Sequence, residues 1–272
     1  MSHEEVVQTD DGVRLRTWTD GDPDAPPLLL INSLGTDLSM WDAQVPGWSP
    51  SHRLLRYDQR GHGTSSVPDG PYTVARLGRD ALTVLDHHGV ERADVCGISL
   101  GGLVALWLAA HVPERVRRVV LADTAAKVGT EDAWRARAAT VREQGMDAVV
   151  DLVLGRFFSP TFRAGRAPAL ARVEQGLRRA APEGYAASCE ALATADLLAE
   201  AAAVRAPCLV VVGTADEATP PADAQALHAA LPHAGYAELP GAGHLANLEQ
   251  PEPFERLVAD FLTRPDLEQG HA

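Results

Sequence analysis

The sequence predicts an α/β fold in which a doubly wound, mostly parallel sheet carries an inserted helical cap. A series of short apolar or β-branched runs ends in turn residues, and several of these runs are apolar throughout, as central parallel strands are. They cover residues 13–19, 28–33, 54–58, 93–98, 116–123, 208–213 and 235–239. Helical patterns lie between them, and this alternation is typical of a doubly wound sheet.

Two helical patterns have a clear apolar stripe. One runs through residues 74–85 and the other through residues 254–262, with apolar side chains at helical spacing. Each stripe gives a helix one face to bury, so we expect both helices to pack on the sheet.

The alternation stops between residues 124 and 206, where helical patterns rich in Ala, Arg and Leu include no strand-like run. This stretch is too long for a loop in a compact domain. We therefore expect a core from residues 1–124 and 207–264 with a helical cap at residues 125–206. Residues 265–272 are polar and are expected to form a tail.

Composition and charge exclude several classes of partner. The chain has 272 residues, of which 46% are hydrophobic, enough for a large core. Its formal net charge of −13 would repel nucleic acid and anionic membranes. No apolar run has the length of a signal peptide or a membrane span. We expect a cytoplasmic protein without nucleic-acid or membrane partners, and the sequence does not indicate its oligomeric state.

The cysteines, Cys96, Cys189 and Cys208, have no CxxC spacing and fall in predicted strands and a predicted helix. We expect buried free thiols, with no metal and no cofactor. Residues 97–102 lack the GxGxxG spacing of a dinucleotide site.

The run YDQRGHGTS contains glycines but lacks the ending of a phosphate-binding loop. We interpret it as a structural turn held by Asp58 and Arg60.

Within residues 95–110, a strand-like run leads into the motif GxSxG, and an apolar helical run follows directly. A sharp strand-to-helix turn strains the serine backbone, and the glycines remove side chains that would collide there. Ser99 would stand exposed above the sheet at a helix N-terminus. This context predicts a nucleophilic serine, and the alternative is a plain glycine-rich turn.

A serine nucleophile needs a base and an acid that orients the base. In a fold of this kind, the acid and then the histidine follow the serine along the chain. Asp216 lies just past a predicted strand, and His244 lies in a glycine-rich loop after the next one. We predict His244 as the base and Asp216 as the acid. Asp123, at another strand end, is an alternative acid, unless it only binds backbone N–H groups.

Acyl chemistry also needs donors for the developing oxyanion. One is the N–H of Leu100. The second is expected from Leu34, where Gly35 lets the backbone curl so that the Leu34 N–H points inward. The alternative for this loop is an ordinary glycine turn.

Several motifs together resemble the α/β-hydrolase superfamily over nearly the whole chain. They are NSLGTDLSMWD, YDQRGHGTSS, GISLGG and GAGHLANLEQPEPF. Within the superfamily, the chain resembles the 3-oxoadipate enol-lactonases of the β-ketoadipate pathway. That family carries an NSLGT loop followed by a Trp-Asp pair, here Trp41 and Asp42, where many relatives have His-Gly. The run ADTAA leading to Trp134, and the pair Gly184-Tyr185, are also similar.

The resemblance implies the α/β-hydrolase fold and the opening of 3-oxoadipate enol-lactone to 3-oxoadipate through an acyl-enzyme on Ser99. It implies that Trp134 lines the pocket from above, the alternative being a tryptophan packed between cap helices. Arg137, one helical turn further on, is a candidate for binding the free carboxylate of the substrate, because a guanidinium can grip a carboxylate with two hydrogen bonds. A solvated arginine is the alternative. Asp123 departs from the family pattern, which has Asn there, as does the run FFSP at residues 157–160.

Other functions stay open. The chain could be a different serine hydrolase, such as a small-ester esterase, a carbon–carbon bond hydrolase or a cofactor-free perhydrolase. It could also be a ligand-binding protein without turnover. Dehalogenase and epoxide-hydrolase chemistry are disfavoured, because those relatives have Asp where this chain has Ser99. For the hydrolases, the partner is a small lactone or ester.

Overall fold

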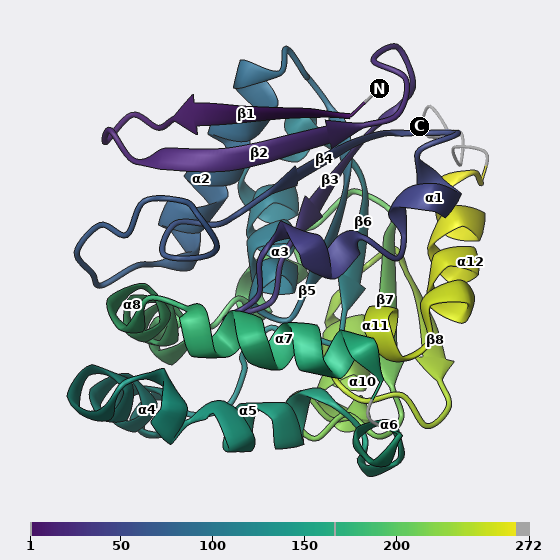
Figure 1. Ribbon diagram of the computed structural model, residues 1–272. Helices are drawn as coiled ribbons and strands as arrows, with labels where there is room; N and C mark the ends of the chain where they lie inside the picture. The colour runs from purple at the N-terminus through teal and green to yellow at the C-terminus, as the bar shows by residue number, and fades with distance from the viewer. Residues whose placement is uncertain (1, 166, 265–272) are drawn as a thin grey trace.

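The computed structural model describes residues 2–165 and 167–264 and has one sheet at its centre with helices on both faces (Figure 1). The eight strands follow the order β1-β2-β4-β3-β5-β6-β7-β8. β1, β2 and β4 pair antiparallel, and β4, β3 and β5 to β8 pair in parallel. The strands are β1 (His3–Gln8), β2 (Arg14–Asp20), β3 (Pro27–Ile31), β4 (Arg53–Tyr57), β5 (Ala93–Ile98), β6 (Val116–Ala122), β7 (Cys208–Gly213) and β8 (Ala234–Leu239). The predicted doubly wound, mostly parallel sheet is confirmed.

The sequence does not reveal β1. This strand lies at the edge of the sheet, and Val7 is the residue of its run HEEVVQ that becomes buried. An edge strand with one buried side chain lacks the apolar pattern by which strands are predicted. Its pairing with β2 places it in the sheet.

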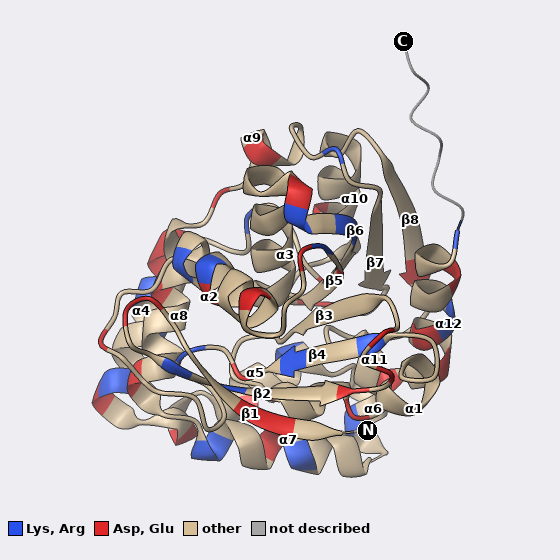
Figure 2. Ribbon diagram, turned by 90° about the horizontal axis from the view of Figure 1, so that it is seen from above, with Lys and Arg blue, Asp and Glu red and all other residues tan. Residues whose placement is uncertain are grey.

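The core helices cover both faces of the sheet. α2 (Val74–His87), α3 (Leu100–His111) and α10 (Pro221–Ala230) lie on one face, and α1 (Val45–Trp48) and α12 (Pro251–Leu262) on the other (Figure 2). α2 and α12 bury the two apolar stripes predicted from the sequence. α3 is buried along nearly its whole length, which explains why its sequence is apolar on all sides.

Most helices between β6 and β7 cover the carboxyl ends of the parallel strands (Figure 1). They are α4 (Glu131–Gln144), α5 (Val150–Phe157), α6 (Pro160–Ala164), α7 (Pro168–Arg179) and α8 (Pro182–Thr194). α4 packs closely against α8. The last helix before β7, α9 (Leu198–Ala201), instead contacts α3 and α10 of the core.

The chain leaves and rejoins the core at neighbouring points. Leu197 N donates a hydrogen bond to Ala126 O at 2.9 Å, just outside the segment that carries α4 to α8. We keep residues 125–206 as the proposed cap. The predicted tail at residues 265–272 lies outside the described residues.

The turn after β4 is held by the two residues predicted for it. Asp58 accepts hydrogen bonds from Leu38 N at 2.8 Å and from Thr64 N at 3.0 Å. Arg60 binds the buried carboxylate of Asp80 on α2 through Nε at 2.5 Å and Nη2 at 2.7 Å. These contacts fix the chain beneath the loop that follows β3.

The three cysteines are buried free thiols, as predicted. Among the described residues, no helix combines the length and the apolar composition needed to cross a bilayer. Figure 2 shows Asp and Glu interspersed with Lys and Arg over the helices on the viewed side.

Candidate active site

Ser99 lies at the sharp turn where β5 ends and α3 begins. Its backbone has a φ of 56°, a positive value that is strained for a residue with a side chain. Ser99 N donates to Ala122 O at 3.1 Å, and the Thr124 hydroxyl donates to Ser99 O at 2.8 Å. Hydrogen bonds to the end of β6 and the residues after it therefore hold the strained turn in place.

The glycines around Ser99 are required by backbone crowding. A Cβ on Gly97 would overlap the carbonyl oxygen of Gly101, and a Cβ on Gly101 would overlap that of Ile31. The start of α3 thus lies directly against the end of β3. A glycine-rich turn without this crowding would not need small residues at both positions.

The expectation that Ser99 stands exposed above the sheet is wrong. Ser99 is only 5% exposed. The reason is that the cap helices lie over the turn and cover Ser99. Ser99 therefore faces an enclosed space and not bulk solvent.

His244 and Asp216 form a buried pair. His244 Nδ1 lies 2.8 Å from Asp216 Oδ2, and both side chains are at most 2% exposed. An ionised Asp216 can only accept hydrogen bonds, so Nδ1 of His244 carries the hydrogen and Nε2 remains available as a proton acceptor. The ring of Phe157 stacks on the imidazole, with the ring centroids 5.6 Å apart.

Asp216 is held in its ionised form. Its Oδ1 accepts from Ala218 N at 2.7 Å and Thr219 N at 3.0 Å, and the Thr219 hydroxyl donates to Oδ2 at 2.8 Å. Burial acts to raise the pKa of Asp216, but His244 and the Thr219 donors outweigh it, so the pKa lies below its ordinary value. The carboxylate is therefore ready to orient and stabilise a protonated His244.

Asp123 has a different set of partners. Its Oδ1 accepts from Gly213 N at 2.8 Å and its Oδ2 from Ala246 N at 3.2 Å. Burial, together with the nearby negative charge of Asp216, raises the pKa of Asp123 well above its ordinary value. This carboxyl joins three chain segments through backbone contacts, and the geometry favours Asp216 as the partner of His244.

The loop after β3 is fixed from below by a histidine. Gly35 has a φ of 75°, and its N–H donates to His62 Nε2 at 2.9 Å. The other ring nitrogen of His62 lies 3.1 Å from Arg60 O, which assigns the hydrogen to Nδ1. Burial lowers the pKa of His62 and so favours the neutral ring that can accept this bond. Leu34 precedes this anchored peptide, and Leu100 is the first residue of α3.

A cavity of about 240 Å³ lies between the carboxyl ends of the strands and the cap helices. Its walls include five of the predicted site residues: Leu34, Ser99 and His244 from the core, and Trp134 and Arg137 from α4. Asp216 lies behind His244, and Leu100 is buried at the base of the turn. The remaining lining residues are Val128, Gly129, Thr130, Ala133, Val153, Arg156, Phe157, Tyr185 and Ala218.

Comparison with known proteins identifies the family. Residues 26–251 match the family model described as the alpha/beta hydrolase fold. The chain belongs to the α/β-hydrolase fold family. This α/β hydrolase is 40% identical to 3-oxoadipate enol-lactonase 2 of Acinetobacter baylyi (strain ATCC 33305 / BD413 / ADP1), in an alignment that covers 96% of this chain and 98% of that protein.

Solved structures agree with this assignment. The enol-lactonase from Burkholderia xenovorans LB400 superposes with a TM-score of 0.93 at 41% identity, covering 96% of this hydrolase and 100% of that chain. A thermophilic esterase from Thermogutta terrifontis superposes with a TM-score of 0.90 at 27% identity, covering 96% of this hydrolase and 98% of that chain. The α/β-hydrolase fold that the sequence motifs indicated is confirmed.

Trp134 and Arg137 lie together on the cavity side of α4 in this hydrolase. Trp134 Nε1 donates to Val128 O at 2.6 Å, which fixes the plane of the indole. The guanidinium carbon of Arg137 lies 4.6 Å from the centre of the indole ring, a cation–π contact. Both side chains are half-buried, so each has one side toward the cavity and one toward solvent.

Three of the lining residues that were not predicted as site residues add an aromatic ring, a charge or a hydroxyl to the cavity. Phe157 contacts His244, Arg156 adds a second positive charge, and Tyr185 contributes a buried hydroxyl that has no hydrogen-bond partner among the described residues. Burial raises the pKa of Tyr185, while Arg137 and Arg156 act in the opposite direction, so both cations lie within electrostatic range of it. The similarity of Gly184-Tyr185 to the enol-lactonases is a signal that could have drawn attention to Tyr185.

Proposed function

We propose that this α/β hydrolase opens 3-oxoadipate enol-lactone to 3-oxoadipate through an acyl-enzyme on Ser99. The observation that carries the proposal is that one cavity is lined by Ser99, by His244 paired with Asp216, and by the cationic Arg137. The similarity to two proteins named as enol-lactonases supports the same substrate.

In the first step, Ser99 Oγ attacks the lactone carbonyl while His244 Nε2 takes its proton. Asp216 stabilises the imidazolium that forms. The N–H groups of Leu34 and Leu100 hold the oxyanion of the tetrahedral intermediate. The hydrogen bond from Gly35 to His62 supports this assignment, because it anchors the loop next to Leu34.

Collapse of the intermediate breaks the bond between the acyl carbon and the ring oxygen. The leaving group is an enolate, which takes a proton from His244 and becomes a ketone. A ketone does not readily attack the acyl group, so the ring stays open. Water then attacks the acyl carbon while His244 takes a proton from it. The bond between the acyl carbon and Ser99 Oγ breaks, His244 returns the proton to Oγ, and the carboxylic acid and free Ser99 are released.

The substrate carries a free carboxylate, which a chain of net charge −13 repels at a distance. We assign Arg137 to bind this carboxylate, with Trp134 forming the wall beside it. The buried Tyr185 hydroxyl supports a polar ligand at this end of the cavity, because it has no partner among the described residues. The Thermogutta terrifontis esterase, whose structure is described as malate bound, is a relative of this fold with a carboxylate ligand.

A small-ester esterase is the second candidate. The observation in its favour is the TM-score of 0.90 to the Thermogutta terrifontis esterase at 27% identity. An esterase of this kind would use the same Ser99, His244 and Asp216 but would not require Arg137.

The test compares wild type and Ser99→Ala on the enol-lactone and on a neutral ester of similar size. We expect wild type to prefer the enol-lactone, and Ser99→Ala to lose at least about a thousandfold in kcat on both substrates. Ser99-dependent turnover of the ester alone would favour the esterase. No Ser99-dependent turnover of either substrate would overturn both functions and favour a ligand-binding protein.

Arg137→Gln on the same two substrates tests the carboxylate contact. We expect KM for the enol-lactone to rise about tenfold while KM for the neutral ester stays unchanged, because only the lactone loses a charge-assisted hydrogen bond. Equal losses on both substrates would remove Arg137 from the substrate site.

A further inference from the structure

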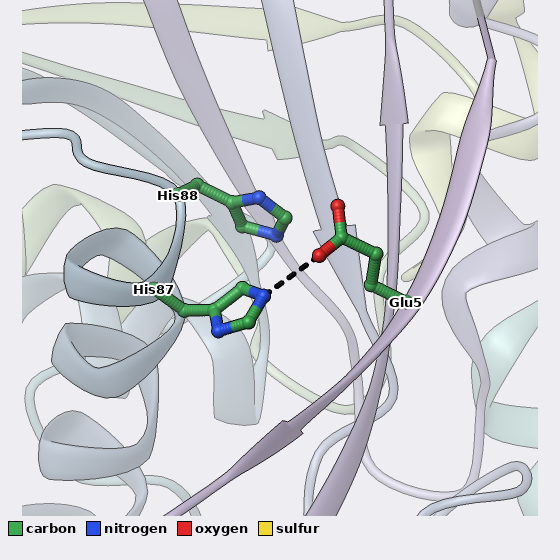
Figure 3. A group of neighbouring side chains, drawn as sticks. All are labelled: Glu5, His87 and His88. Carbon is green, nitrogen blue, oxygen red and sulfur yellow. Dashed lines mark hydrogen bonds and ion pairs between the residues drawn. The ribbon is translucent and has the colours of Figure 1, made fainter.

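Outside the active-site cavity, three metal-ligating side chains converge where the edge strand β1 meets the C-terminal end of α2. They are Glu5 on β1, His87 at the end of α2, and His88 directly after it (Figure 3). One ligand atom from each residue lies within 4.8 Å of the other two. His87 Nε2 is 2.8 Å from Glu5 Oε2, so the pair is already in contact across the two elements.

His3 stands next to this cluster. Residues two apart on a strand share a face, and His3 Nε2 lies 3.5 Å from Glu5 Oε1. The Thr17 hydroxyl on β2 lies 3.3 Å from His88 Nε2 and helps to orient that ring. The rings of His87 and His88 are perpendicular, with centroids 5.0 Å apart.

The chemistry of these side chains selects the kind of ion. Imidazole nitrogens and one carboxylate are typical ligands of Zn²⁺ and of neighbouring transition metals, whereas Mg²⁺ and Ca²⁺ prefer oxygen ligands alone. Around a tetrahedral ion with bonds of about 2.1 Å, ligand atoms lie roughly 3.4 Å apart. The side chains of Glu5, His87 and His88 are partly exposed, so small rotations would shorten the distances between their ligand atoms to this value.

Two charge effects act in opposite directions on cation binding at this cluster. The net charge of −13 attracts cations, but the positive Arg53 acts on His88. The carboxylate of Glu5 acts on His88 in the opposite direction and so offsets this repulsion. The cluster could not be predicted from the sequence, because Glu5 and His87 are 82 positions apart in the chain.

We propose that Glu5, His87 and His88, with His3 as the fourth ligand, bind one divalent first-row transition-metal ion, with Zn²⁺ the expected occupant. The bound ion ties the edge strand β1 to α2. None of these residues is among those that line the cavity around Ser99, so the site is separate from the proposed hydrolysis.

The test is calorimetric titration of Zn²⁺ into chelator-treated full-length protein, together with thermal unfolding with and without Zn²⁺. We expect a single saturable site and a rise in Tm with Zn²⁺. Glu5→Gln and His88→Asn should each weaken Zn²⁺ binding at least about tenfold and abolish the rise in Tm. His233→Asn is the matched control, because His233 is an exposed histidine between α10 and β8, and it should leave both readouts unchanged.

Two results would overturn the proposal. One is the absence of saturable binding in wild type at millimolar Zn²⁺. The other is binding in Glu5→Gln and His88→Asn with the affinity of wild type, which would place the ion elsewhere. A thermal transition at the wild-type Tm in the absence of Zn²⁺ shows that each variant is folded. His87→Asn, whose side chain is 38% exposed, replaces any variant that does not fold.

Discussion

Two buried carboxyls near His244 differ in what they bind, and a matched pair of substitutions tests the difference. In Asp216→Asn, the hydrogen-bond acceptor for His244 Nδ1 is replaced by an amide that favours the wrong tautomer. We therefore expect kcat to fall about ten-thousandfold. Asp123→Asn keeps an oxygen for Gly213 N, and Asn tolerates the φ of 44° at this position. We expect its kcat to stay within several-fold of wild type.

The measurement is turnover of a small activated ester by both variants, with Tm as the check on folding. The opposite ranking, a large loss in Asp123→Asn and a small one in Asp216→Asn, would assign the acid to Asp123.

The buried Tyr185 hydroxyl has no hydrogen-bond partner among the described residues, and this predicts the effect of removing it. An unpaired buried hydroxyl costs about 1–3 kcal/mol, and a polar atom of the substrate would relieve this cost. Tyr185→Phe should therefore lower kcat/KM for the enol-lactone about tenfold, while Tm stays the same or rises because the unpaired group is gone. A lower Tm with unchanged kcat/KM would mean that the hydroxyl supports the fold and does not contact substrate.

Ser99, Asp216 and His244 could be proposed from the sequence because each lies at or shortly after the end of a strand, and strand ends can be read from local patterns. Tyr185 and Phe157 could not be assigned to the site from local patterns, because both lie in helices whose orientation depends on how the cap helices pack. Whether such a side chain faces the cavity or the cap interior is decided by contacts between segments far apart in the chain.

Among the elements, the loop after β3 depends on one buried histidine. In His62→Ala, the Gly35 N–H loses its acceptor, so the peptide next to Leu34 is no longer fixed. A small displacement of catalytic groups can cost about a hundredfold in rate, so we expect a loss of this order in kcat with little change in KM. Kinetics on the enol-lactone or a neutral ester check this.

His62→Gln is the control, because its side-chain oxygen can accept the same hydrogen bond. It should recover part of the lost kcat. If Gln is no better than Ala, or if KM changes as much as kcat, His62 does not act by positioning the loop.

The central strands and the helices on the sheet were predictable because their apolar periodicity is strong. The edge strand β1 was not, because it buries only Val7 and is held by its pairing with β2. The cap was predictable as a helical segment. The position of Trp134 and Arg137 beside the cavity was implied by the family resemblance and not by the local pattern of α4. That placement depends on the packing of α4 against α8.

For the molecule as a whole, Asp58 predicts a pH dependence of stability. Burial raises its pKa from 3.8 to about 6, against the opposing donors Thr64 N and Leu38 N. The folded state therefore binds this proton more tightly than the unfolded state. The resulting stabilisation is fully present below about pH 4 and is lost as the pH rises through about 6.

The free energy of unfolding of wild type relative to Asp58→Asn should therefore fall by about 2–3 kcal/mol between about pH 4 and pH 7. Urea denaturation of both proteins across this range measures the difference, and the other titrating groups cancel in the comparison. A difference that does not change with pH would show that the ionised and neutral forms of Asp58 are equally well accommodated.

The hydrogen bond between Leu197 N and Ala126 O has a consequence for how such a molecule can diversify. Because the two ends of the cap segment meet, we expect that residues 127–196 can change in length, or be replaced by the matching segment of a relative, without a change in the order of the strands. Ser99, Asp216 and His244 all lie outside this segment, whereas Trp134, Arg137 and Tyr185 lie inside it. Under the proposed function, the residues assigned to bond breaking therefore lie outside this segment, and those assigned to the substrate end of the cavity lie inside it.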